Sequence, residues 1–218
     1  MKNSRAVRTF IEFLDEEGQE DKADRLLVYI PMTKEEIDDF IDRRIFLDYL
    51  YTFQKLLPKQ IDKAIDRGEY LDYLYVFQKL SPENIDYALE KGKDLNYLYQ
   101  KQTLTSEQIN KAIDKGEYLS VLYQYKELTP ENIDHAIDKG KDLNYLYENK
   151  KQTFTPENID KAIDKGKYLD YLYEKQILTP QNIDHAIDKR EELGVLYRYQ
   201  KLSPGQIDKA IDKGIRLD

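Results

Sequence analysis

Residues 129–152 read TPENIDHAIDKGKDLNYLYENKKQ, and this stretch decides the fold. Thr129 stands where a helix N-cap is expected and is followed by Pro130, which suits the first helical position. The next apolar residues are spaced i, i+3 and i+4, namely Ile133, Ala136 and Ile137. Because this spacing puts them on one side of a helix, the stretch predicts a short amphipathic helix.

A second short helix is predicted directly after the first. Gly140 can end the first helix in a left-handed cap, and Asp142 can cap the next helix. The same apolar spacing follows at Leu143, Leu146 and Tyr147. Residues 129–152 are therefore expected to form a helical hairpin.

The hairpin pattern repeats along the chain. The string Ile-Asp-x-Ala-Ile-Asp recurs with small variations every 24 residues, with one step of 26 caused by two extra residues within 148–155. Its eight copies begin at Ile37, Ile61, Ile85, Ile109, Ile133, Ile159, Ile183 and Ile207. A hairpin this short cannot bury both apolar stripes alone, whereas stacked neighbours share one core. We therefore predict an all-α fold, an α-solenoid of about eight 24-residue helical-hairpin repeats.

The array is expected over residues 32–218, with repeats that start near 33, 57, 81, 105, 129, 155, 179 and 203. Residues 1–31 do not fit the repeat but carry two other apolar stripes. We expect them to form an N-terminal helical cap, because the terminal units of such arrays need a different outer face.

The eighth repeat supplies a first helix and no second one. This end is expected to leave three apolar residues partly bare, namely Ile207, Ile211 and Leu217. One hypothesis is that the end docks on another chain, for instance a second copy in a homodimer with a two-fold axis. The alternative is a short frayed end covered by the seventh repeat, and both interpretations stay open.

Composition excludes several classes of protein. The chain carries 34 Lys+Arg against 42 Asp+Glu, a net charge of −8, which disfavours direct binding to nucleic acid. No apolar run approaches the roughly 20 residues that span a bilayer, and the first residues lack the apolar core of a signal peptide. We expect no membrane contact and a cytoplasmic location. The absence of cysteine excludes thiolate catalysis and iron–sulfur clusters.

Tyrosine is abundant, with 19 copies, and most of them fall in two columns of the repeat. The inner column is unbroken over Tyr51, Tyr75, Tyr99, Tyr123, Tyr147, Tyr173 and Tyr197. The outer column consists of Tyr49, Tyr73, Tyr97, Tyr145 and Tyr171, with Val121 and Val195 in the other two repeats. We expect the inner column to pack in the core. The outer column either packs or grips a partner, since exposed tyrosines anchor many interfaces.

Carboxylates form two further columns, spaced i, i+4 within each first helix. The later column includes four candidate partner-binding residues, namely Asp66, Asp114, Asp138 and Asp164. These acids lie toward helix C-termini, where the helix dipole disfavours them. Either they bond to a following loop or to a Lys or Arg of the neighbouring repeat, or they present a negative line to a basic partner. Interleaved lysines weaken the second interpretation.

No catalytic or metal-binding constellation is evident. His135 and His185 share a variable position that is occupied elsewhere by Asp39, Lys63, Tyr87, Lys111, Lys161 and Lys209. Neither histidine has a Ser–His–Asp or His–His arrangement at helical spacing. We therefore expect a protein that is not an enzyme, with no catalytic residue, no metal and no cofactor.

The string Leu-Thr-Pro-Glu-Asn-Ile-Asp-x-Ala-Ile-Asp at residues 128–138 resembles the short helical units of the leucine-rich repeat variant and HEAT-like families, as in phage and bacterial repeat proteins. That resemblance implies binding to other macromolecules. The expected function is a non-catalytic scaffold for a protein partner, such as a phage or viral inhibitor of a host protein in the host cytoplasm. Two alternatives remain, an acidic nucleic-acid mimic that occupies a basic groove and a tyrosine-lined trough for a nucleotide or other small molecule.

Overall fold

The computed structural model describes residues 31–213 together with Thr9 and Phe13. Over residues 31–213 the chain forms fifteen α-helices and no strand, with a regular period of about twelve residues per helix. The predicted all-α solenoid of helical hairpins is confirmed for this range. Apart from Thr9, Phe13 and Pro31, the expected N-terminal cap lies outside the described residues. Leu217 lies outside them too.

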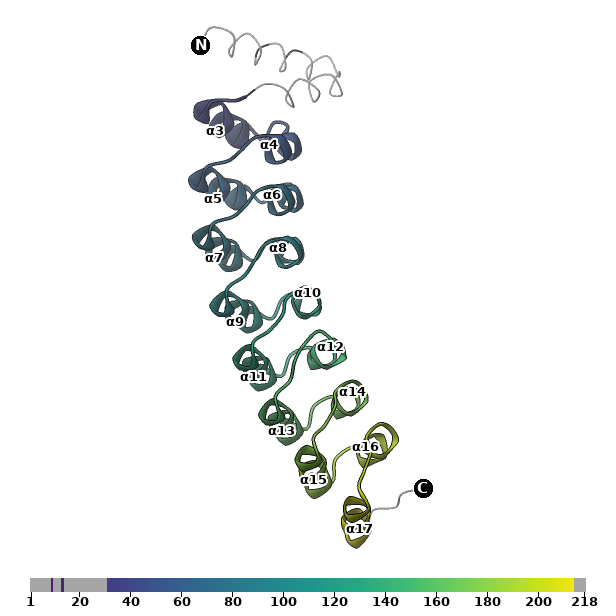
Figure 1. Ribbon diagram of the computed structural model, residues 1–218. Helices are drawn as coiled ribbons and strands as arrows, with labels where there is room; N and C mark the ends of the chain where they lie inside the picture. Colours follow the sequence, from purple (N-terminus) through teal and green to yellow (C-terminus); the bar gives the residue numbers. More distant parts are fainter. Residues whose placement is uncertain (1–8, 10–12, 14–30, 214–218) are drawn as a thin grey trace. The chain divides into compact units, whose positions relative to one another are not determined.

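The chain divides into two compact units, residues 1–103 and 104–218. In the first unit each hairpin has a ten-residue first helix and a seven-residue second helix. The hairpins are α3 (Lys34–Arg43) with α4 (Leu47–Phe53), α5 (Pro58–Arg67) with α6 (Leu71–Phe77), and α7 (Pro82–Lys91) with α8 (Leu95–Lys101). The first helices α3, α5 and α7 pack side by side in one row, and α4, α6 and α8 pack in another (Figure 1).

The second unit repeats this arrangement. Its hairpins are α9 (Ser106–Lys115) with α10 (Leu119–Tyr125), α11 (Pro130–Lys139) with α12 (Leu143–Glu148), α13 (Pro156–Lys165) with α14 (Leu169–Lys175), and α15 (Pro180–Lys189) with α16 (Leu193–Tyr199), followed by the first helix α17 (Pro204–Asp212). Consecutive first helices pack on one another, as do consecutive second helices (Figure 1). In the described part of the chain, no helix is both long and apolar enough to cross a membrane.

The first helix α11 begins and ends as the repeat predicts. At Thr129 the side-chain oxygen accepts a hydrogen bond from the Asn132 backbone N–H at 3.3 Å, which satisfies a donor that the helix leaves free. Gly140 ends the helix in the left-handed conformation, with φ of 66°. Arg44 and Arg190 occupy the position of this glycine in their repeats and adopt the same conformation, with φ of 59° and 62°.

The expected cap of the second helix is wrong. Asp142 makes no side-chain capping bond, and its backbone is left-handed, with φ of 52°. The other residues that precede second helices share this conformation, namely Phe46, Tyr70, Asp94, Tyr118, Tyr168 and Glu192. Only three residues separate Lys139 from Leu143. A second left-handed residue turns the chain within that short connection, and this backbone geometry replaces the side-chain cap.

The core holds the inner tyrosine column. From Tyr51 to Tyr173 its six rings are 0 % exposed, while Tyr197 is half-buried. The hydroxyls of Tyr75 and Tyr123 donate to the backbone carbonyls of Lys93 and Lys141, at 3.2 and 3.4 Å. Burial raises the pKa of these phenols well above its usual range. The inner column is therefore packing, as the repeat pattern predicts.

Buried glutamines join consecutive second helices. Gln78 lies at the C-cap of α6, and its side-chain oxygen accepts from the Leu56 N–H at 3.1 Å. Its amide nitrogen donates to the carbonyls of Tyr51 and Gln54 at the end of α4, at 2.8 Å for Gln54. The same bonds recur at the buried Gln102 and Gln152 and at the half-buried Gln200. Each glutamine thus satisfies backbone groups that a helix end would otherwise leave unpaired in the core.

Buried amides also join the first helices. Asn84 donates through its side chain to the Pro58 carbonyl at 2.9 Å and to an Asp62 carboxylate oxygen at 2.7 Å. The pattern recurs in the second unit, where Asn158 donates to Asp134 and Asn182 donates to Asp160. Three aspartates of the earlier carboxylate column therefore accept hydrogen bonds from the following repeat.

The left-handed cap gives a first test. Replacing Arg190 with glycine should raise the free energy of unfolding by roughly 0.5 to 1 kcal/mol, because glycine adopts positive φ without steric cost. Gly140→Ala should lower it by about 1 kcal/mol for the same reason. The new Cβ atom would lie 2.9 Å from the flexible Lys167 Nζ, so the backbone dominates that cost. Thermal unfolding measures both, and equal midpoints for the two variants would contradict this account.

The glutamine bonds give a second test. Gln78→Ala should destabilise the protein by about 2 to 4 kcal/mol, because it leaves the Leu56 N–H and two carbonyls buried without partners. Gln100→Ala, on the half-exposed side of α8, is the matched control and should cost under about 1 kcal/mol. Urea unfolding followed by circular dichroism compares them. Similar losses in the two variants would remove the special role of Gln78.

Candidate functional site

The outer side of the second helices exposes aromatic rings in the first unit. On α6, Tyr73 and Phe77 are 39 % and 52 % exposed and stack with ring centroids 6.2 Å apart. On α4, Tyr49 and Phe53 stack in the same way at 6.0 Å. Because α4 packs against α6, these four side chains lie on neighbouring helices. We call them the aromatic face.

The remaining residues of the outer tyrosine column are less clustered. Tyr97 on α8 is 36 % exposed and Tyr145 on α12 is 46 % exposed, while Tyr171 on α14 is half-buried. Valine takes the same position on α10 and α16. Three residues of the outer column are thus exposed, namely Tyr73, Tyr97 and Tyr145, and α4 and α6 carry the stacked pairs described above.

The later carboxylate column forms clasps between consecutive first helices. Asp138 on α11 accepts from Lys161 Nζ at 2.7 Å and pairs with Lys165 Nζ at 3.1 Å, both on α13. Asp66 on α5 is held by the Tyr87 hydroxyl at 2.7 Å and by Lys91 Nζ at 2.8 Å. In the second unit, Asp114 and Asp164 are clasped in the same way by a histidine and a lysine. All four candidate carboxylates therefore have cationic partners.

The variable position of the repeat supplies one arm of each clasp. His135 Nε2 lies 2.9 Å from an Asp114 oxygen, and His185 Nε2 lies 3.0 Å from Asp164. The corresponding residues in other repeats, such as Lys63, Tyr87 and Lys209, bond the preceding acid too. The position varies in size and charge, yet the residues just named can all donate a hydrogen bond. The sequence shows that these residues share a hydrogen-bond donor, but only the contacts in the structure show that the donor bonds the acid of the preceding repeat.

The clasps stabilise the charged form of the acids. Hydrogen bonds from Lys213 and Lys209 lower the pKa of Asp188 to about 2 from 3.8. Bonds from Lys161 and Lys165 also lower the pKa of Asp138. The Asp188 side chain is 52 % exposed, so solvent screens this pairing and limits its contribution to stability.

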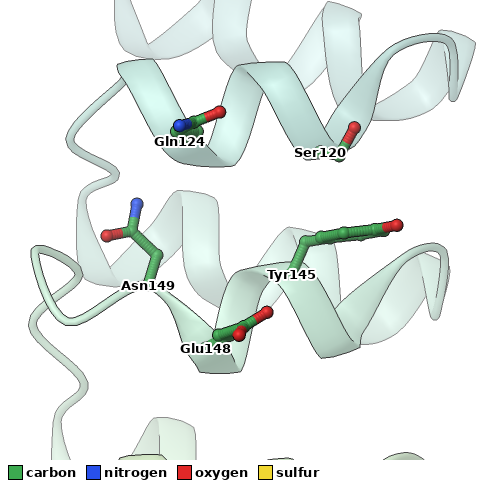
Figure 2. Close-up of a pocket in the computed structure, with 5 residues that line it drawn as sticks. All are labelled: Ser120, Gln124, Tyr145, Glu148 and Asn149. Carbon is green, nitrogen blue, oxygen red and sulfur yellow. The ribbon is translucent and has the colours of Figure 1, made fainter.

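A pocket of about 440 Å³ opens between α10 and α12 in the second unit (Figure 2). Its lining residues are Ser120 and Gln124 on α10, Tyr145 and Glu148 on α12, and Asn149 at the C-cap of α12. Sequence reasoning selected only Tyr145. The signal for the others was the local departure from the repeat, where two residues are inserted within 148–155 and valine replaces the outer tyrosine on α10.

The last described helix carries the two remaining apolar candidates. Ile207 and Ile211 on α17 are 37 % and 55 % exposed. Over the residues that the structure describes, no group of three or more His, Asp or Glu side chains could hold a metal ion. The two histidines are engaged with aspartates instead.

Comparisons with known proteins identify no family for this chain. No protein-family model matches it, and no curated protein or solved structure shows significant similarity to it. The helical repeat and the surfaces described above are therefore the observations that bear on its function.

The clasps give a third test, which concerns pH. Because folding lowers the pKa of Asp188, its clasp stabilises the fold above about pH 4, and this contribution disappears as the pH falls from 3.8 toward 2. Asp188→Asn should therefore lower the thermal midpoint at pH 7, which corresponds to a loss of less than about 1 kcal/mol in the free energy of unfolding. The difference from wild type should shrink as the pH falls from 3.8 to about 2 and vanish below that pH.

Asp170→Asn removes the same charge from an exposed position on α14 and is the control. A deficit of Asp188→Asn that stays constant from pH 7 to about 2 would show that the clasp does not act through ionisation.

Proposed function

We propose that this chain is a non-catalytic scaffold that binds a protein partner through the outer side of its second helices. The observation that carries the proposal is the aromatic face, where two stacked pairs lie on packed helices and all rings but the half-buried Tyr49 are exposed, namely Phe53, Tyr73 and Phe77. Large aromatic side chains that remain exposed on rigid elements are typical anchors of protein interfaces.

The clasped carboxylates support this choice of surface. A basic partner that bound Asp66 or Asp138 would have to displace lysines already within 2.7 to 3.1 Å. The same pairing counts against the acidic nucleic-acid mimic, since each of these negative charges has a cation beside it. The aromatic rings need no such displacement, because their exposed surface becomes buried directly when a partner docks.

The finer parts of the proposal rest on the repeat pattern. A likeness to the leucine-rich repeat variant and HEAT-like families, and a role as a phage or viral inhibitor acting in a host cytoplasm, agree with a helical array that offers a long binding surface.

A homodimer through α17 is a separate proposal, supported by the exposure of Ile207 and Ile211. Analytical sedimentation measures the mass of the wild type and of the Ile211→Asp variant in solution. The wild type should sediment as a dimer and the variant as a monomer, and a monomeric mass for both would exclude the dimer.

Partner binding gives a fourth test. Proteins retained by the immobilised full chain are identified by mass spectrometry, and the purified candidate is then titrated by calorimetry. The double variant Tyr73→Ser with Phe77→Ser should weaken binding by at least about tenfold, because it removes a stacked aromatic anchor.

Tyr118→Ser is the matched control, since this tyrosine is 50 % exposed but precedes α10. It should bind as wild type does. Circular dichroism and the thermal midpoint check that each variant is folded. Unchanged binding by the folded double variant, or binding lost in the control alone, would reject the aromatic face as the partner site.

A further inference from the structure

The pocket between α10 and α12 lies where the repeat is interrupted. Asn149 stands where the other second helices place Phe53, Phe77, Lys101, Tyr125, Lys175 and Tyr199, all larger side chains. Its side-chain nitrogen donates to the Tyr123 carbonyl at 2.5 Å, and its oxygen accepts from the Lys151 N–H at 3.0 Å. These bonds hold Asn149 at the end of α12, which is six residues long instead of seven.

Helix α10 departs from the repeat at two further positions. Ser120 stands where the second helices α6, α8, α12 and α14 carry aspartate or asparagine, and Val121 replaces the outer tyrosine. The pocket has a volume of about 440 Å³, which falls in the range of small-ligand sites and has room for one long side chain with some water.

The lining chemistry is one-sided. Glu148 contributes a carboxylate, and Ser120 and Gln124 contribute oxygen atoms that can accept hydrogen bonds, whereas the Asn149 amide is already bonded to Tyr123 and Lys151. Tyr145 adds a half-exposed aromatic ring. No cationic side chain is among these lining residues. Lys175 on α14 interacts electrostatically with Glu148, but its amine pairs with Glu174 at 2.6 Å.

We propose that this pocket receives an arginine side chain of the protein partner. A guanidinium group can stack on the ring of Tyr145 while it donates two parallel hydrogen bonds to Glu148, and its remaining N–H groups match the acceptors of α10. Lysine fits less well, because its compact ammonium group offers neither the flat face nor the paired donors. A phosphate-bearing ligand is disfavoured, because Glu148 would repel it.

This inference rests on the proposed function in one respect, namely that the arginine belongs to a protein partner. Its test does not need that partner. The full-length protein, labelled with nitrogen-15, is titrated with Nα-acetyl-arginine methylamide up to roughly 50 mM, since one such contact supports only weak affinity. Amide signals of Ser120, Tyr145 and Asn149 should shift and saturate. Nα-acetyl-lysine methylamide should bind at least about threefold more weakly.

Two matched variants locate the charge. Glu148→Gln should weaken binding of the arginine probe by at least about fivefold, because it removes the bidentate acceptor. Asp170→Asn, which removes the same charge from an exposed position on α14, should leave binding within about twofold of wild type.

Absence of saturation, equal binding of the lysine probe, or unchanged binding by Glu148→Gln would each overturn the inference. A partner that binds through the aromatic face but ignores Glu148→Gln would overturn only this inference and leave the proposed function standing. Conversely, arginine-specific saturation without any protein partner would support the pocket while the proposed function fails.

Discussion

A helix of seven residues ends almost as soon as it begins, so its backbone carbonyls must find partners outside it. In this chain the side chain of a buried glutamine from the next hairpin supplies them, as Gln78 does for Tyr51 and Gln54. The same glutamine accepts the Leu56 N–H in the connecting segment. Within each of the two units, one polar side chain thereby joins a hairpin to the previous one, in a core that also buries the inner tyrosines.

The two rows of helices use their exposed sides differently. Along the first helices, acids such as Asp138 are neutralised by donors of the following repeat, so this side is occupied by contacts of the array itself. On the second helix α6, by contrast, Tyr73 and Phe77 remain exposed beside one another. We place the proposed binding surface on the second helices because their exposed aromatic rings are accessible to a partner, whereas the acids of the first helices are already paired.

Irregularity in the repeat has a separate consequence. A strictly periodic array would present the same surface at every step, with one large side chain after another along the second helices. At Asn149 and Val121 this sequence is interrupted, and the space left between α10 and α12 is polar and lined by the Glu148 carboxylate. Specific recognition needs a feature that occurs at one place, and an exception to a repeat provides it.

The sequence by itself determined the helical hairpins, because the apolar spacing, the Thr or Ser caps and the glycine stops are local signals that recur every 24 residues. It also indicated the buried inner tyrosines, which the pattern keeps without exception. The side-chain cap at Asp142 was expected and is absent, because two left-handed residues make the turn instead. Only the tertiary structure decided which acid contacts which donor and where a pocket opens. It also showed that residues as different as Lys161 and His135 both contact an aspartate of the preceding repeat. These depend on contacts between residues 21 to 29 positions apart, and periodicity along one chain does not state which atoms of neighbouring repeats meet.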